Sequence, residues 1–290
     1  MQNERSVLIT GCSSGIGYCV AHGLKGRGYR VFATARKPED VERLCSEGLE
    51  SLPLDLSRSE SIRGAVEEIG ERTGCRLYAL FNNGAYAQPG AVEDLRRDVL
   101  RQQFETNLFG THELTSLVLP WMRARGEGRI VQNSSILGFI AMAYRGAYNS
   151  AKYALEGLSD TLRLELRGSG IYVSLIEPGP IESRFRANAL RAFRENIDRE
   201  ASVHRDLYHA VEARLSAEGP VAPFTLPPEA VLKRVVHALE SPRPRARYSV
   251  TTLTYLFRFL KRILPDRMLD AVLDRAGSGE RKRALSQAQK

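Results

Sequence analysis

The chain lacks a long apolar segment: no stretch of about 18 residues is free of charge, so we expect no helix that spans a membrane. Its first residues, 1–6, also lack the apolar core of a secretory signal peptide. Because of these two absences, we expect neither an integral membrane protein nor a secreted protein. We therefore expect a cytoplasmic protein.

Cysteine is scarce and follows no pattern. The four cysteines, Cys12, Cys19, Cys45 and Cys75, form no Cys-x-x-Cys pair and have no histidine partners at metal-ligand spacing. A disulfide framework and a structural zinc site are therefore not expected, and we expect no metal. Reduced thiols fit a cytosolic protein.

Most of the chain also lacks an excess of one charge sign. The net charge is +8, and the twelve Lys and Arg residues after residue 242 outnumber the four Asp and Glu residues there by eight. The first 242 residues are therefore balanced. This distribution argues against a nucleic-acid-binding surface spread over the molecule.

Apolar runs typical of strands alternate with helical patterns along the chain, which indicates βα units on a parallel sheet. We expect an α/β fold of the Rossmann type, a doubly wound parallel seven-stranded sheet with helices on both faces. Ser57 and Glu60 predict a capping box at the start of the third helix. The expected strands are Ser6–Thr10, Tyr29–Thr34, Leu49–Leu54, Leu77–Asn82, Arg129–Asn133, Ile171–Ile176 and Arg247–Thr251, and the expected helices are 15–26, 39–47, 59–73, 96–124 and 147–168.

A glycine-rich turn, Thr10-Gly-Cys-Ser-Ser-Gly-Ile-Gly17, follows the first strand and opens the first helix. Glycines there let the backbone approach a pyrophosphate, and the helix N-terminus supplies N–H groups and positive potential. The turn predicts a dinucleotide site.

The second strand ends in Arg36 and Lys37, with no Asp or Glu where an acid would bind the ribose 2′-hydroxyl of NAD. A guanidinium can bind a 2′-phosphate with two parallel hydrogen bonds, so we expect NADP (NADPH). The alternative is a solvated basic turn. Asp55, at the end of the third strand, either accepts a hydrogen bond from the adenine amino group or is a turn residue.

A second constellation carries chemistry for a carbonyl group. Tyr148 and Lys152 lie four residues apart on one face of an expected helix, and Ser135 precedes the tyrosine by thirteen residues. A phenol with a pKa of about 10 is a poor proton donor at neutral pH unless a nearby ammonium stabilises its phenolate. The Ser135 hydroxyl can hydrogen-bond a substrate oxygen as negative charge develops. Asn107 could hold a water that links Lys152 to solvent.

In this combination the sequence resembles the short-chain dehydrogenases/reductases over residues 6 to about 185. The motifs that carry the resemblance are Thr10-Gly-x-x-x-Gly-x-Gly17, Asp55-Leu, Asn82-Asn-Gly-Ala, Asn107, Ser135, Tyr148-x-x-x-Lys152 and Pro178-Gly179. The resemblance implies that Tyr148 is the acid/base, that Ser135 orients the carbonyl, that Lys152 binds the nicotinamide ribose, and that Asn107 belongs to the proton relay. It further implies cofactor contacts from Gly11, Ser13, Ser14, Gly15, Ile16, Gly17, Arg36, Lys37, Asp55, Leu56, Asn83, Gly84, Tyr148, Lys152, Pro178, Gly179, Ile181 and Ser183.

Two positions depart from the family pattern. The usual Asn-Asn-Ala-Gly is Asn-Asn-Gly84-Ala85 here, which puts the path of this turn in doubt, and Ser183 stands where the family often has Thr. The residues that fill these motifs are similar to those of one subgroup of the family. That subgroup contains retinol and 17β-hydroxysteroid dehydrogenases and bacterial NADP-dependent aldehyde reductases. That similarity implies an apolar carbonyl or alcohol substrate, and the resemblance to the family implies a homodimer or homotetramer.

We expect residues 1–250 to form the Rossmann-fold catalytic domain, and residues 183–225 to form either a helical lid over an apolar pocket or helices that only pack on the core. The apolar residues of that segment are Phe185, Leu190, Phe193, Leu207, Tyr208, Val211 and Leu215. Amphipathic basic helices at 251–275 and a disordered tail at 276–290 follow.

In the segment 252–264, apolar and aromatic residues gather on one side of a helical wheel, and Arg258, Lys261 and Arg262 gather on the other. This pattern is typical of a helix that lies in a membrane interface, at the inner face of a membrane for a cytoplasmic protein. The alternative is a helix that packs on protein and keeps a solvated basic side.

The favoured function is an NADP-dependent oxidoreductase that interconverts an apolar aldehyde or ketone and its alcohol. An alternative is a catalytically idle NADP-binding sensor that acts through its basic tail, although the intact Ser135, Tyr148 and Lys152 disfavour it. Nucleotide-sugar epimerisation, which uses a similar Tyr/Lys pair, is disfavoured because the chain lacks a larger C-terminal domain.

Overall fold

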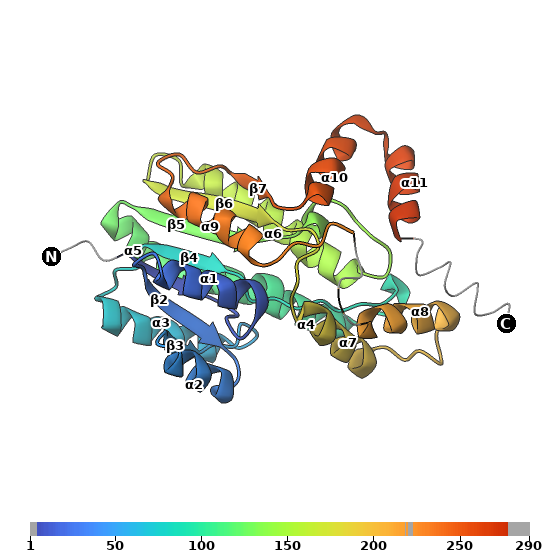
Figure 1. Ribbon diagram of the computed structural model, residues 1–290, viewed down its shortest axis with the longest axis horizontal. Coiled ribbons are helices and arrows are strands. Elements are labelled where there is room, and N and C mark those ends of the chain that lie inside the picture. Colours follow the sequence, from blue (N-terminus) through green and yellow to red (C-terminus); the bar gives the residue numbers. More distant parts are fainter. Residues whose placement is uncertain (1–4, 218, 220–222, 278–290) are drawn as a thin grey trace.

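One parallel sheet of seven strands forms the centre of the molecule (Figure 1). The computed structural model describes residues 5–217, 219 and 223–277. The strands lie in the order β3-β2-β1-β4-β5-β6-β7, and every neighbouring pair is parallel, which confirms the expected fold. Their bounds are β1 Ser6–Ile9, β2 Arg30–Ala35, β3 Glu50–Pro53, β4 Ala79–Asn82, β5 Gly128–Asn133, β6 Ile171–Glu177 and β7 Arg247–Ser249.

The strand order reverses between β1 and β4. The chain builds outward from β1 to β3, then crosses back to β4 on the other side of β1 and continues outward to β7. In open α/β sheets a ligand crevice lies at such a switch point, outside the carboxyl ends of the strands. The turns that follow β1, β4, β5 and β6 are therefore the expected walls of a site.

Helices cover both faces of the sheet, and alternate residues of β1 divide between the two cores. Val7 and Ile9 pack in the core under α1 (Gly15–Lys25), α2 (Pro38–Ser46) and α9 (Glu229–Glu240), whereas Leu8 packs in the core under α3 (Ser59–Thr73) and α5 (Gly110–Arg125). Because side chains alternate along a strand, a strand covered on both faces is apolar throughout. α6 (Gly146–Glu165) joins the second core through Leu162. In Figure 1, α1 and α9 lie over the sheet.

The predicted single helix 96–124 is wrong in one respect. The structure divides it into α4 (Arg97–Phe104), a π-helical turn over Glu105–Phe109, and α5. The wider turn contains Asn107, whose buried side chain bonds both backbone groups of Tyr86. Gly110 then starts α5 close to Leu56. A Cβ on Gly110 would lie 1.8 Å from the carbonyl oxygen of Leu56.

The predicted capping box at the start of α3 is also wrong. The N-cap of this helix is Arg58, which makes no side-chain capping bond. The Ser57 hydroxyl instead donates to Asp55 Oδ1 at 2.7 Å, and the backbone N–H of Ser57 donates to the same oxygen at 2.9 Å. Asp55 therefore competes successfully for the hydroxyl that the capping box needs.

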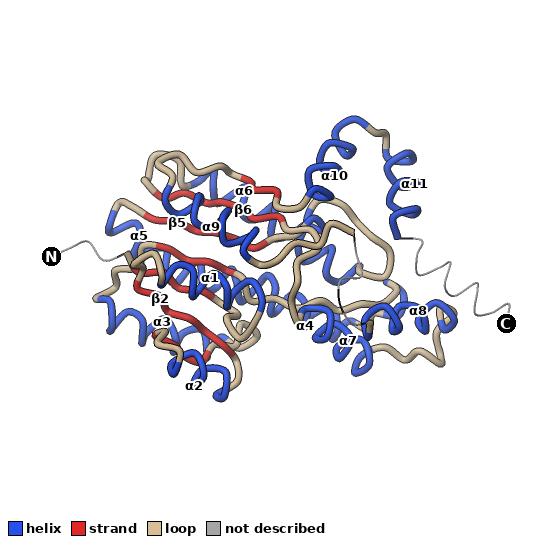
Figure 2. The backbone as a smooth tube through the Cα atoms, viewed as in Figure 1, coloured by secondary structure: helices blue, strands red, loops and turns tan. Residues whose placement is uncertain are grey.

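Four further helices lie beyond the carboxyl ends of the strands (Figure 2). They are α7 (Phe185–Asn196), α8 (Arg205–Ser216), α10 (Thr252–Ile263) and α11 (Asp266–Gly277), and short 3₁₀ turns occur at Val92–Asp94 and Ile136–Gly138. The pair α7 and α8 builds a small separate core around Phe193 and Tyr208. No helix among the described residues combines the length and apolar character needed to cross a bilayer. Residues 278–290 of the expected disordered tail lie outside the described residues.

α10 is amphipathic, and two of its three cations, Arg258 and Lys261, contact the protein, whereas Arg262 is exposed. Arg258 forms an ion pair with Glu177, and the Lys261 ammonium donates to the carbonyl oxygen of Phe139. The exposed apolar side chains Tyr255 (50%), Leu256 (47%), Phe259 (59%) and Ile263 (55%) form what we term the α10 ridge. Part of the basic side therefore packs on the protein, while Arg262 and the α10 ridge stay exposed.

Candidate active site

The turn between β1 and α1 is shaped by close backbone approaches. Gly11 and Gly15 have φ of +70° and +57°, a region that L side chains rarely adopt. A Cβ on Gly17 would lie 2.2 Å from the carbonyl oxygen of Gly11, and a Cβ on Gly11 would lie 2.7 Å from Cα of Gly84. The N-cap Ser14 makes no capping bond, so the first N–H groups of α1 are not used by its hydroxyl. This geometry fits an anion such as a pyrophosphate.

The turn after β4 is fastened to the glycine turn through Thr10 and Asn83. The Asn83 amide donates to the carbonyl oxygens of Thr10 and Gly11 at 3.0 and 3.1 Å. The backbone N–H groups of Asn83 and Gly84 donate to Thr10 Oγ1 at 2.9 and 2.8 Å. A Cβ on Gly84 would lie 3.1 Å from Leu56 Cδ1, closer than most side-chain contacts. The departure from the family pattern thus places a glycine where a Cβ would crowd Leu56 and Thr10.

The basic pair after β2 lies on the surface. Arg36 and Lys37 are exposed, and Lys37 is the N-cap of α2. Within the described residues no hydrogen bond or ion pair holds the Arg36 guanidinium, although its charge lowers the pKa of Tyr86 against the larger rise that burial causes. Asp55 accepts two hydrogen bonds from Ser57, one from its backbone N–H and one from its hydroxyl, so it acts as a turn residue in this structure.

Tyr148 and Lys152, both on α6, are buried beside the end of β5. The Ser135 hydroxyl lies near enough to the Tyr148 phenol to lower its pKa, and Lys152 Nζ lies 5.7 Å from the centroid of the Tyr148 ring. Ser135 Oγ also accepts from the N–H of Leu137 at 3.1 Å. Lys152 Nζ donates to the carbonyl oxygen of Asn133 at 2.6 Å. The structure therefore brings the predicted serine, tyrosine and lysine together.

Burial shifts the pKa values of Tyr148 and Lys152, the two groups that exchange protons. Loss of solvation raises the pKa of Tyr148 to about 12, although the nearby Ser135 hydroxyl opposes the rise. Burial lowers the pKa of Lys152 to about 8, although the charge of Glu156 opposes the fall. At neutral pH the phenol is therefore protonated and the lysine still carries most of its charge.

Sequence reasoning missed Asn133 at this site, whereas it named Phe185 among the apolar residues of the expected lid. Asn133 accepts from Lys152 and donates from its amide to Asn83 Oδ1 at 2.9 Å, so it joins the chemical end to the nucleotide end. Its position two residues before Ser135, at the end of a buried strand, is the signal in the sequence. The ring of Phe185 lies edge-on to that of Tyr148, with centroids 5.4 Å apart.

Asn107 is placed differently from the other three predicted catalytic residues. Its Nδ2 donates to the Tyr86 carbonyl at 2.8 Å, and its Oδ1 accepts from the Tyr86 N–H at 3.2 Å. Both ends of the amide are therefore used by backbone, and Asn107 fixes the segment that follows Gly84.

The segment after β6 returns to the glycine turn. The carbonyl oxygen of Pro178 accepts from the N–H of Ile136 at 2.8 Å. Ile181 forms a parallel bridge with Leu226, and Ser183 lies so close to Gly15 that a Cβ there would meet the Ser183 Cβ at 2.9 Å. The predicted residues 178–183 thus border both the serine turn and the pyrophosphate turn.

A cavity of about 360 Å³ lies between the segment 139–145 and α11. Its apolar lining includes Ile140, Met142 and Leu269. Neither Ser135 nor Tyr148 lines it, so this cavity is not the chemical centre. It adjoins the centre through the chain that follows Ser135.

The short chain dehydrogenase family matches residues 5–192 of the chain. The uncharacterized oxidoreductase YbbO of Escherichia coli K12 is 45% identical over 270 residues, which cover 93% of this chain and 94% of that protein. Human retinol dehydrogenase 16 is 32% identical over 283 residues, 93% of this chain and 88% of that protein. The crystal structure of an actinorhodin polyketide ketoreductase variant with NADPH has a TM-score of 0.70 at 27% identity and covers 86% of this chain and 96% of that one.

The chain belongs to the short-chain dehydrogenase/reductase family. It is accordingly an oxidoreductase that uses a nicotinamide cofactor and acts on a small molecule. The resemblance inferred from the motifs, including that to retinol dehydrogenases, is confirmed.

Proposed function

We propose that the protein is an NADP-dependent oxidoreductase that interconverts an apolar aldehyde or ketone and its alcohol, with Tyr148 as acid/base. The observation that carries the proposal is that three groups come together at the end of β5: the buried Tyr148 phenol, the Ser135 hydroxyl that lowers its pKa, and the Lys152 ammonium held by the Asn133 carbonyl. A phenol, a hydroxyl donor and a fixed positive charge are the groups that proton transfer to a carbonyl requires.

Each of these residues has its own part in the reaction. Tyr148 gives its proton to the carbonyl oxygen during reduction and takes a proton from the alcohol during oxidation. Ser135 can donate to the same oxygen, because its own oxygen already accepts from Leu137. The charge of Lys152 stabilises the phenolate in a buried site, where electrostatic interactions are strong. Asn107 acts in the relay by fixing the Tyr86 segment, and it could bind a water through its remaining lone pair.

The cradle around Gly11, Gly17 and Gly84 fits a dinucleotide, because a Cβ on Gly11 or Gly17 would meet backbone and a Cβ on Gly84 would meet the side chains of Leu56 and Thr10. Ser13, Ser14, Gly15 and Ile16 would bind the pyrophosphate with Gly11 and Gly17. Leu56, Asn83 and Gly84 would border the adenosine, and Pro178, Gly179, Ile181 and Ser183 would border the nicotinamide. When bound, the cofactor supplies or accepts the hydride. Lys152 would in addition bind the nicotinamide ribose.

Arg36 and Lys37 favour NADP over NAD. The Arg36 guanidinium is exposed, within electrostatic range of Tyr86, and the described residues hold no partner that would compete with a 2′-phosphate. In addition to its place in the turn, Asp55 would accept a hydrogen bond from the adenine amino group. With NADPH as the usual cellular reductant, reduction is the proposed direction.

An apolar substrate is supported by the surroundings of Tyr148. The ring of Phe185, at the start of α7, packs edge-on against the phenol, and α7 and α8 enclose apolar side chains between them. The likeness to retinol dehydrogenase 16 points in the same direction. We propose that the segment 183–225 covers the substrate as a lid.

The test follows NADPH absorbance with long-chain aldehydes, retinoids and steroid ketones. We expect turnover with at least one class and none with small polar carbonyls. Tight NADPH binding without turnover of any substrate would instead favour the idle sensor.

We also propose peripheral contact with an anionic lipid surface through the α10 ridge. Tyr255, Leu256, Phe259 and Ile263 are about half exposed or more, and the exposed Arg262 lies in the same helix turn as Phe259 and Ile263. Apolar side chains flanked by cations suit an interfacial helix, and each cation near an anionic surface adds about 1 kcal/mol.

Sedimentation with vesicles that contain phosphatidylserine tests this contact. We expect the wild type to sediment and a Phe259→Ser, Ile263→Ser double variant to stay in solution. Leu164→Ser, which changes an exposed leucine of α6 that is 52% exposed, serves as the control. Equal sedimentation of the double variant and the wild type would contradict the proposal.

A homodimer or homotetramer is the proposed assembly, since the family commonly forms oligomers. Light scattering of the purified protein measures it directly. A monomer at micromolar concentration would contradict this proposal.

A further inference from the structure

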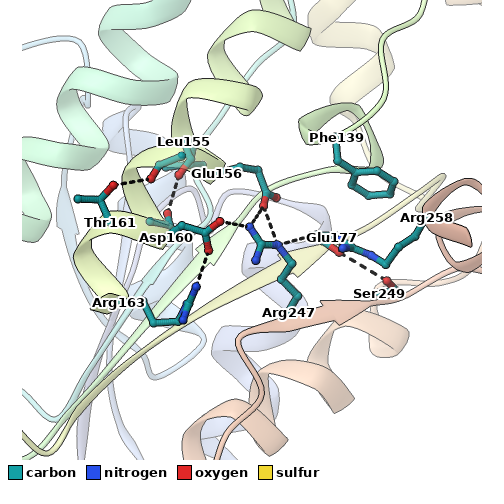
Figure 3. A network of polar contacts seen from close by, with 12 residues as sticks. Phe139, Leu155, Glu156, Asp160, Thr161, Arg163, Glu177, Arg247, Ser249 and Arg258 are labelled. Atoms are coloured by element: carbon teal, nitrogen blue, oxygen red, sulfur yellow. Dashed lines mark hydrogen bonds and ion pairs between the residues drawn. The ribbon is translucent and has the colours of Figure 1, made fainter. Parts of the chain in front are cut away.

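α10 contacts two segments that border the chemical centre, and one side chain, Arg258, contacts both (Figure 3). The first segment is the end of β6, which leads into Pro178 and Gly179. The second is the turn from Ser135 to Phe139. Arg258 lies on the side of α10 that faces the protein, opposite the exposed α10 ridge.

At the first segment, Arg258 pairs with a carboxylate that has no exposure to solvent. Glu177 is the last residue of β6 and is 0% exposed. Besides Arg258, its partners are Arg247 Nε at 3.3 Å and the Ser249 hydroxyl at 3.5 Å. Burial, aided by the charge of Glu156, raises the pKa of Glu177 to about 7, and the two guanidinium groups oppose that rise. A buried carboxylate that loses a partner is strongly destabilising.

α10 also touches the residues that follow Glu177. A Cβ on Gly179 would lie 2.1 Å from Oγ1 of Thr251, the N-cap of α10, and 3.1 Å from Oγ1 of Thr254. The carbonyl oxygen of Pro178 accepts from the N–H of Ile136, which lies in the second segment. The first segment is thus held by α10 on one side and by the serine turn on the other.

At the second segment, the Arg258 guanidinium stacks on the ring of Phe139, with Cζ 4.5 Å from the centroid. The carbonyl oxygen of Phe139 accepts from Lys261, the next basic residue on this side of α10. Phe139 directly follows the 3₁₀ turn Ile136–Gly138, whose N-cap is Ser135. A guanidinium on an aromatic face adds attraction to the ion pair with Glu177.

The two segments are joined a second time through α6. Glu156, one helical turn after Lys152, accepts from Arg247 Nε at 3.1 Å, and Arg247 also pairs with Asp160 and Glu177. A Cβ on Gly138 would lie 3.1 Å from Cγ of Glu156. Figure 3 shows Arg247 between these carboxylates and Arg258 between Glu177 and Phe139.

We infer that Arg258 is a positioning residue that holds the Glu177–Gly179 segment against the Ser135–Phe139 turn, and so sets the place of Ser135 relative to the cofactor. Arg258 touches no reacting group and acts through Glu177 and Phe139. The effect of Arg258 on catalysis rests on the proposed function. Its contacts with the two segments do not.

Hydrogen exchange tests the inference without any activity measurement. The N–H groups of Ile136 and Leu137 are the reporters, because one donates to Pro178 and the other to Ser135. In Arg258→Gln, we expect exchange in peptides that cover residues 134–140 to accelerate by about tenfold or more, as local opening becomes easier. Arg262→Gln, a change at an exposed arginine one turn further on, should leave the rate unchanged.

A second variant separates position from stability. Arg258→Gln combined with Glu177→Gln removes the unpaired buried charge and should restore the melting temperature. Exchange at 134–140 should stay fast in this double variant, and kcat for the carbonyl substrate should stay about tenfold low while the Kd for NADPH stays within about threefold. Wild-type exchange in either variant would overturn the inference. Absence of turnover by the wild-type enzyme would instead refute the proposed function and leave the exchange result to decide the role of Arg258.

Discussion

Lys152 donates a hydrogen bond from its ammonium to the carbonyl oxygen of Asn133, with 2.6 Å between Nζ and O. This bond fastens α6, which contains Tyr148, to the end of β5, which leads into Ser135. Asn133 also donates to Asn83, whose amide bonds the glycine turn. A single chain of contacts therefore connects the proton-transfer groups with the nucleotide cradle.

The buried charge of Lys152 predicts a pH-dependent stability. Because the pKa of Lys152 is lowered to about 8 in the folded protein and is about 10.4 in an unfolded chain, the folded state loses this proton first. The lysine therefore lowers stability below pH 8, and its own contribution to the stability of the wild type rises as pH increases from 8 to about 10.5. In Lys152→Met this rise should be missing. Urea unfolding of both proteins between pH 7 and pH 10 measures the difference, and parallel pH profiles would contradict the prediction.

Arg36 should decide the choice of cofactor. In Arg36→Asp a carboxylate would repel the 2′-phosphate and accept the ribose 2′-hydroxyl, so the NADP-to-NAD ratio of kcat/KM should fall by about tenfold or more. Arg76→Asp makes the same charge change at an exposed site before β4, at the opposite end of the sheet, and should leave the ratio unaltered. An unchanged ratio in Arg36→Asp would show that this residue is only a solvated turn.

Gly17 should be required for NADPH binding. In Gly17→Ala the new Cβ would lie 2.2 Å from the Gly11 carbonyl oxygen and 2.6 Å from Asn83 Nδ2, so the cradle must distort, at about 1–3 kcal/mol. We expect the rise in melting temperature on adding NADPH to be lost. Gly64→Ala, in an exposed and uncrowded part of α3, should stabilise by up to about 1 kcal/mol and keep the full NADPH response. A wild-type NADPH response in Gly17→Ala would contradict this account of the cradle.

Much of the fold and the site could be predicted because local patterns determine them. The strands are short apolar runs bounded by turns, and the spacing of Tyr148 and Lys152 places both on one helix face. α9 was missed, although Val231, Val235, Ala238 and Leu239 follow a helical period and pack in the core that also contains α1.

Other features depend on partners that are distant in sequence. A helical wheel separates the two sides of α10 but does not say which side meets the protein. That side is chosen by Glu177 and Phe139, which lie far upstream. The π-helical turn at Asn107 likewise depends on the backbone of Tyr86. The glycine at position 84, where the family usually has alanine, likewise lies close to the distant side chains of Leu56 and Thr10.

The central claim is that Tyr148 transfers the proton, and Tyr148→Phe tests it most directly because it removes only the hydroxyl. The measurement is kcat for NADPH-dependent carbonyl reduction, together with the Kd for NADPH of the same preparation. We predict that kcat falls by about a hundredfold to ten-thousandfold while NADPH binding is retained. A variant that reduces the carbonyl at the wild-type rate would contradict the account.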